Sequence, residues 1–152
     1  KRTATLAAAL AVLATASPAT AQGAGQQFVG MWSCNSTYTE LDQWGNRKSG
    51  FSRFYQIQIN SNGTFQAEGY TPGVYGNDPF QSQGQWKIDQ GALLADGPEY
   101  GPNVLPGMKF IMVGQLQDGQ LTSRYDMKDP SGTWIMNRSL MSCQRGGGQQ
   151  GW

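Results

Sequence analysis

The sequence predicts an all-β domain, a single eight-stranded antiparallel up-and-down barrel closed by one disulfide between its first and last strands. Aromatic and β-branched runs recur eight times, separated by breaks that contain glycine. After residue 21, no segment keeps a helical period of apolar residues without interruption by glycine or proline. The two cysteines lie in the first and the last of the eight runs.

The first residues are typical of a secretory signal. Lys1 and Arg2 precede an Ala/Leu/Val run that Pro18 ends, and residues 19–21 are small, as signal peptidase requires. We expect 1–21 to be a signal peptide and the protein to be periplasmic or secreted; the alternative is an Ala-rich helix docked on the domain. We further expect a flexible segment at 22–27, the barrel at 28–143 and a flexible Gly/Gln-rich tail at 144–152.

The predicted strands are joined by two kinds of connection that alternate. The strands are expected at 28–38, 51–60, 64–70, 80–88, 92–95, 108–116, 120–127 and 133–143. The joins at 60–63, 89–91 and 117–119 have the Asn-Gly or Asp-Gly chemistry of tight hairpins. The joins at 39–50, 71–79 and 96–107 are long. Every second connection of a meander falls at the same end, so short turns close one end and long loops, with 128–132, surround the other.

Barrel closure and the disulfide support each other. The first and last strands become neighbours only when the sheet closes, and Cys34 and Cys143 lie in those strands. An exported chain meets an oxidising compartment, and no third thiol competes for the pairing. The alternatives are two free buried thiols and, for the fold, a two-sheet sandwich.

Composition excludes several classes of function. The chain has 152 residues and no histidine, which excludes Ser-His-Asp and Cys-His nucleophile pairs and His-ligated zinc enzymes. Without Lys1 and Arg2, nine of the 11 basic side chains remain against 10 acidic ones, and they are dispersed rather than gathered on one segment, so nucleic acid is not an expected partner. Beyond the signal, no run is long enough to span a membrane. We therefore expect a protein that is not an enzyme and has no transmembrane segment.

The run Gly30-Met31-Trp32 in the first predicted strand resembles the opening of the calycins, the superfamily of lipocalins, fatty-acid-binding proteins and avidins. The resemblance implies that Trp32 plugs the closed end of the barrel and that a cation from near the last strand lies across it. Arg138 is the natural candidate for that cation, and Gly30, Trp32 and Arg138 would be structural. The resemblance also implies a small apolar molecule or lipid held in the barrel.

Aromatic and large apolar side chains are the candidates for binding such a ligand. Four rings fall in or beside the long loops, namely Trp44, Tyr70, Tyr75 and Tyr100. The strands contribute Trp86, Phe110, Met112 and Tyr125, together with Trp134 and Met136. The alternative is that these side chains fill and cover a solid core.

The second predicted strand leaves the character of the pocket open. Tyr55, Ile57 and Ile59 share one face, and Gln56 and Gln58 share the other. If the glutamines point inward with Gln66 or Gln83, the pocket is polar; if they point outward, as glutamine prefers, it is apolar.

Neither the methionines nor the acidic residues require a metal. Six methionines suggest Cu(I), but no histidine or free cysteine supports them, and methionine commonly fills cores. Asp126 with Asp129, or Asp96 with Glu99, could act as acid and base or hold Ca²⁺. Turn chemistry explains both Asp129-Pro130-Ser131-Gly132 and Asp96-Gly97-Pro98 more simply. We assign no catalytic residue, no metal ligand and no cofactor.

The function that the sequence favours is therefore a non-enzymatic, exported binding protein with a small, mostly apolar ligand in a barrel cup. One alternative is a protease inhibitor, because a group of exported bacterial inhibitors of metalloproteases is similar in its signal, early Gly-x-Trp and small barrel. Residues 22–27 would then enter the protease cleft. The other is a structural or envelope module with a filled barrel.

Overall fold

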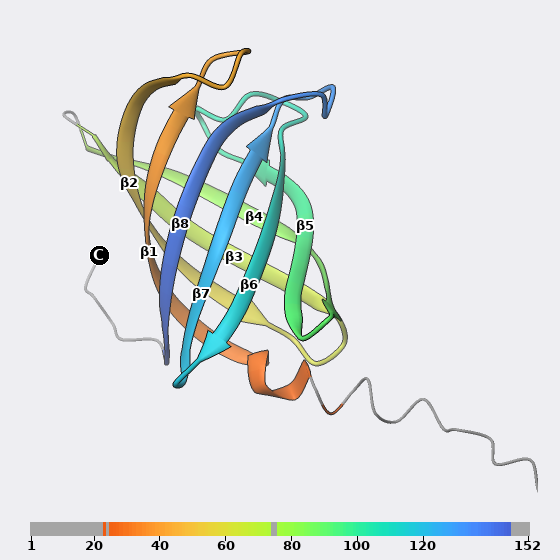
Figure 1. The fold of residues 1–152 in the computed structure, drawn as a ribbon. Coiled ribbons are helices and arrows are strands. Elements are labelled where there is room, and N and C mark those ends of the chain that lie inside the picture. Colours follow the sequence, from red (N-terminus) through yellow and green to blue (C-terminus); the bar gives the residue numbers. More distant parts are fainter. Residues whose placement is uncertain (1–22, 24, 74–75, 147–152) are drawn as a thin grey trace, which may run out of the picture.

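The computed structural model describes residues 23, 25–73 and 76–146, which form one closed antiparallel barrel (Figure 1). Neighbouring strands follow the chain order, and the last strand pairs with the first. The elements are η1 (Gln26–Phe28), β1 (Gly30–Leu41), β2 (Arg47–Ile59), β3 (Thr64–Gly73), β4 (Gly76–Asp89), β5 (Ala92–Tyr100), β6 (Lys109–Gln117), β7 (Gln120–Lys128) and β8 (Ile135–Arg145). The prediction of an eight-stranded up-and-down barrel is confirmed.

The tight turns close one end of the barrel, as predicted. Gln90 and Gly91 have φ of 49° and 81°, and Asp118 and Gly119 have φ of 51° and 78°. Two successive positive φ values define the hairpin turn whose twist matches that of the flanking strands. Gly63, at φ 84°, completes the third short connection. The Asn-Gly and Asp-Gly pattern therefore identified these turns correctly.

At the opposite end, which we call the mouth, the strands run further than the sequence predicts. β3 and β4 continue until Gly73 pairs with Gly76. β5 runs through 96–98, where the sequence predicts a turn. Gly97 faces Gly84 across β4 and β5, and a Cβ on Gly97 would lie 2.0 Å from the backbone oxygen of Gln83. Glycine here permits close strand approach rather than a turn.

The barrel interior is packed with side chains. Tyr55, Ile57 and Ile59 are buried, while Gln56 and Gln58 are only partly buried and line the outer wall, so the outward orientation expected for the glutamines is confirmed. The ring centroids of Phe110 and Tyr125 lie 5.0 Å apart, and those of Phe65 and Phe110 lie 5.1 Å apart. Rings from β3, β6 and β7 thus meet across the interior, and Met112 is buried in the same core.

The disulfide joins the first and last strands as predicted. Cys34 and Cys143 are direct cross-strand partners of β1 and β8 with a Cα–Cα distance of 4.0 Å. Because these strands are remote in sequence, the bond fixes the seam at which the barrel closes.

The closed end is plugged by Trp32, but its cation is not the predicted one. The indole Nε1–H donates to the Phe28 carbonyl at 2.8 Å, and the guanidinium carbon of Arg145 lies 4.5 Å from the ring centroid. Arg138 is wrong for this role, since it pairs with Asp126 at 3.1 Å on the outer wall. The register explains the exchange, because β8 brings Arg145 opposite Trp32.

The ends of the domain also differ from the expected segments. Arg145 donates to the carbonyls of Gln27 and Val29, so η1, which begins inside the predicted flexible segment 22–27, is tied to the closed end. Gly30 has φ 131°, which favours glycine there. β8 extends to Arg145, so it ends inside the predicted tail. The predicted signal peptide at 1–21 and the rest of the predicted tail lie outside the described residues. In the described part of the chain, no helix has the length and apolar character to cross a bilayer.

Candidate ligand pocket at the barrel mouth

A pocket of about 220 Å³ opens at the mouth of the barrel. Its apolar wall comes from the loop before β6, the end of β7 and the start of β8. The lining residues are Glu40, Leu41, Lys48, Arg53, Glu99, Asn103, Val104, Leu105, Met108, Met127, Trp134, Met136 and Asn137. Arg53 and Glu99 have side chains only 11% and 0% exposed, so they form the floor, which we call the floor ion pair.

The floor ion pair is tightly made. Arg53 Nη1 lies 2.6 Å from Glu99 Oε1, and Arg53 Nε donates to Thr71 Oγ1 at 3.0 Å. The guanidinium also lies over aromatic rings, 4.2 Å from the Phe80 centroid and 4.7 Å from that of Tyr38. Arg53 Nη1 also donates to the Tyr38 hydroxyl at 3.5 Å, and the guanidinium makes a further hydrogen bond with Tyr55. Of the five N–H donors of a guanidinium, Thr71, Glu99, Tyr38 and Tyr55 therefore take four, which leaves one for a ligand.

Three buried tyrosines surround this pair, and we call them the tyrosine cluster: Tyr38, Tyr55 and Tyr125. The Tyr125 hydroxyl donates to Glu99 Oε2 at 2.7 Å, and the Tyr55 hydroxyl donates to that of Tyr38 at 2.7 Å. Burial is the main cause that raises the pKa of all three above the ordinary value for tyrosine. The hydroxyls therefore remain protonated at neutral pH. Both oxygens of Glu99 are occupied by donors from the protein.

The charge on Arg53 is secure. Burial alone would lower the pKa of the guanidinium, but the facing Tyr38 and Glu99 hold it above its ordinary value. The floor is therefore a neutral pair built from a fixed cation and its carboxylate partner.

The alternation of two strands places these charges inside. Arg53 precedes Tyr55, Ile57 and Ile59 on the inward face of β2. In the same way, Glu99 follows Leu93 and Ala95 on β5. The sequence suggests Glu99 only as a possible acid, base or Ca²⁺ ligand beside Asp96, and it does not single out Arg53 or the pairing of the two. The period-2 pattern was the available signal, because Arg53 lies two residues before Tyr55 within the predicted strand 51–60 and Glu99 lies four residues after Ala95.

Most of the predicted ligand-binding residues that the structure describes lie away from this pocket. Phe110, Met112 and Tyr125 belong to the packed core, and only Tyr125 reaches the floor ion pair. Trp86 lies at the closed end, where its indole N–H donates to the Asn60 carbonyl at 2.8 Å.

The predicted mouth rings also lie elsewhere. Tyr70 stacks on Phe54 with centroids 5.1 Å apart, and Tyr100 is half exposed on the outer wall. Trp44 stands in solvent at a loop tip, and Tyr75 lies outside the described residues. Of the large side chains considered from sequence, Trp134 and Met136 do line the mouth pocket.

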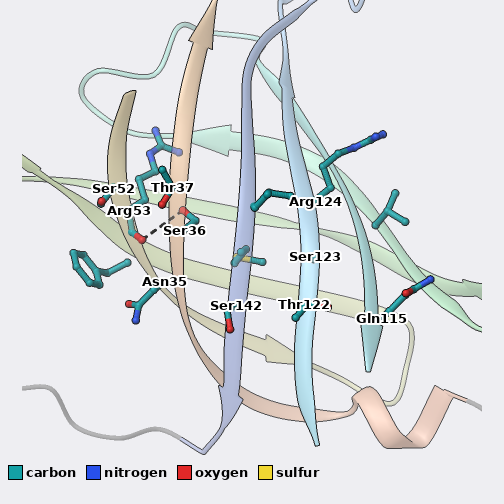
Figure 2. A pocket seen from close by; sticks show the side chains of 14 residues that line it. Asn35, Ser36, Thr37, Ser52, Arg53, Gln115, Thr122, Ser123, Arg124 and Ser142 are labelled. Atoms are coloured by element: carbon teal, nitrogen blue, oxygen red, sulfur yellow. Dashed lines mark hydrogen bonds between the residues drawn. The ribbon is translucent and has the colours of Figure 1, made fainter. Parts of the chain in front are cut away.

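Two larger hollows lie on the outer wall. One, of about 810 Å³, runs over β7, β8, β1 and β2 and is lined mainly by hydroxyl and amide side chains such as Asn35, Thr122 and Ser142 (Figure 2). The other, of about 540 Å³, holds the glutamines that had suggested a polar interior, including Gln66 and Gln83. Arg53 of the floor ion pair is also among the lining residues of the larger hollow, whereas neither Arg53 nor Glu99 lines the other.

The acidic residues considered from sequence have other roles. The Asp129 carboxylate accepts hydrogen bonds from the backbone N–H groups of Ser131 and Trp134 at 3.2 and 2.9 Å. Burial raises the pKa of Asp129, but these bonds and one from the Ser131 hydroxyl outweigh it and lower the pKa to about 2. The turn assignment is correct for Asp129, whereas Glu99 is buried and ion-paired. Within residues 23, 25–73 and 76–146, no group of three or more His, Cys, Asp or Glu side chains is placed to hold a metal.

The sequence matches no protein-family model and no curated protein. The pocket therefore has to be interpreted from its own chemistry.

Proposed function

We propose that this chain is an exported, non-enzymatic binding protein that holds one small, mostly apolar and electrically neutral molecule in the mouth pocket. The observation that carries the proposal is the floor ion pair beneath an apolar wall. Buried ion pairs add little net stability, and replacement by apolar residues is often neutral or stabilising. Such a pair facing a pocket is better explained by recognition than by folding.

The charge balance of the floor selects the ligand class. Arg53 is already neutralised by Glu99 at 2.6 Å, so a carboxylate ligand would add an uncompensated negative charge beside Glu99. A neutral acceptor, such as a carbonyl, hydroxyl or ether oxygen, can take a hydrogen bond from the remaining N–H of the guanidinium without that cost. The rest of the ligand would contact Trp134 and the methionines.

The volume limits the size of the ligand. The pocket holds about 220 Å³, which is below the roughly 300–1,000 Å³ typical of sites for drug-sized molecules. The rings beneath the floor leave the ligand no deeper place in the barrel. The disulfide fits an oxidising compartment, which supports export.

The test combines mass spectrometry with a matched pair of probes. The protein, exported to an oxidising periplasm, should show a stoichiometric mass excess in its native spectrum that disappears on denaturation without reduction. Stripped protein should bind 1-naphthol, a neutral aromatic alcohol, more tightly than 1-naphthoate, its anionic counterpart. Val104→Trp, which fills the pocket, should abolish binding, and Leu140→Ser on the outer wall should not. Absence of both the mass excess and naphthol binding would overturn the proposal; tighter binding of naphthoate would overturn the neutral ligand class.

A further inference from the structure

Trp44 stands in solvent at the tip of the loop between β1 and β2, with 77% of its surface exposed. The loop is held by its own hydrogen bonds. Asp42 Oδ1 accepts the backbone N–H of Trp44 at 3.0 Å and that of Asn46 at 2.8 Å, and the Gly45 N–H donates to the Asp42 carbonyl at 2.9 Å. Hydrogen bonds from Asn46 lower the pKa of Asp42, so the carboxylate remains an acceptor at neutral pH. The loop thus fixes a large apolar ring in water instead of burying it.

A second apolar tip lies at the same end of the barrel. Leu105, 53% exposed, belongs to the loop between β5 and β6 and lines the mouth pocket. This loop is also internally bonded, since the Val104 N–H donates to the Gly101 carbonyl and the Met108 N–H to the Leu105 carbonyl, both at 3.2 Å. Figure 1 shows both loops at the end opposite the tight turns. The pocket therefore opens beside two protruding apolar side chains.

We propose that these loops dock the barrel on a lipid bilayer with its mouth toward the membrane, so that the pocket exchanges its ligand with the bilayer. The ligand part rests on the proposed function, whereas docking itself does not. An indole combines an apolar ring with a polar N–H and favours the level of the lipid headgroups. Separate convex tips suit insertion between headgroups, whereas a protein partner is usually bound by a contiguous, packed patch.

The charges beside Trp44 predict which lipids are needed. Glu40 and Asp42 are matched by Arg47 and Lys48, all on or next to the same loop. Because these charges cancel, docking should be driven by apolar contact. It should not require anionic lipid and should change little with salt.

The experiment is sedimentation of the full disulfide-bonded protein with sucrose-loaded phosphatidylcholine vesicles. Wild type should sediment with the vesicles, with a partition coefficient that is similar at low and high salt and with added phosphatidylglycerol. Trp44→Ser should lower the coefficient by on the order of tenfold or more, and Leu105→Ser by less. Leu140→Ser is the matched control, because Leu140 is 73% exposed but lies on the barrel wall, and it should change nothing.

Three outcomes would overturn docking by the mouth. These are no sedimentation of wild type, binding only to anionic vesicles at low salt, or an equal loss in the Leu140 variant. Failure of the pocket proposal is distinguishable, because the Arg53→Met/Glu99→Leu double variant should lose 1-naphthol and still sediment with vesicles. If wild type binds naphthol but no vesicles, docking fails and the pocket stands.

Discussion

Replacement of Arg53 by methionine is expected to destabilise the barrel by about 3–5 kcal/mol. Glu99 is 0% exposed and keeps only the Tyr125 hydroxyl as a donor once the guanidinium is gone. The variant therefore leaves an uncompensated charge in the interior, and for a domain of this size we expect the Tm to fall by roughly 10–20 °C. The measurement is urea unfolding followed by circular dichroism, with the disulfide intact.

A double-mutant cycle separates the interaction energy of the floor ion pair from the individual effects of Arg53 and Glu99 on stability. Glu99→Gln should cost less than Arg53→Met, about 1.5–3 kcal/mol, because the amide oxygen still accepts from Tyr125 and Arg53 retains a path to solvent. The Arg53→Met/Glu99→Leu double variant should lie within about 1–2 kcal/mol of wild type, since apolar groups then replace both charges. The same variant should fold and yet lose 1-naphthol binding.

Two results would refute this reasoning. A cost below about 1 kcal/mol for Arg53→Met would mean that the ion pair is not desolvated as the structure places it. A double variant as unstable as Arg53→Met alone would mean that the pair supports the fold, which removes the argument that it is present for recognition.

Other expectations test the rest of the framework. Burial raises the pKa of each tyrosine in the cluster, so the stability that the three protonated hydroxyls contribute should be complete below pH 10. Above pH 10 the free energy of unfolding should fall by about 1.4 kcal/mol per pH unit for each tyrosine. Ultraviolet titration should show three tyrosines that ionise only when the protein unfolds, and ionisation of every tyrosine near pH 10 would contradict this. Alanine at both Cys34 and Cys143 should cost about 5 kcal/mol in urea, because the bond spans a separation of 109 residues. Arg145→Ala should cost about 1–2 kcal/mol through Trp32 and the η1 carbonyls, and Arg138→Ala less than about 0.5 kcal/mol; the reverse order would contradict the register.

The strand number, their order and the short turns were predictable because each is encoded locally. Asn-Gly and Asp-Gly pairs permit the positive φ that a two-residue hairpin needs, whichever fold surrounds them. The strand ends at the mouth were not predictable in this way. Gly97 lies in a segment whose sequence is typical of a turn, yet in the structure it allows β4 and β5 to approach closely. Only the presence of the neighbouring strand shows which of these two roles the glycine has.

The cation that lies over Trp32 could have been predicted from the sequence. If Cys34 lies directly opposite Cys143 in an antiparallel pair, two steps back along one strand match two steps forward along the other, which brings Arg145 to Trp32. Arg138 falls opposite Thr39, near the mouth. The disulfide therefore carried register information as well as a closure constraint.

The floor ion pair shows what local pattern cannot supply. β2 and β5 share no ladder, so Arg53 and Glu99 meet only because the closed sheet turns both inner faces toward one axis. Alternation could have placed each charge inside, but it names no partner. Closure of the sheet brings the two inner faces together, and a buried cation and a buried anion enclosed by one wall are stable only when paired. Barrel topology and the cost of burying charge together predict the contact that neither strand predicts alone.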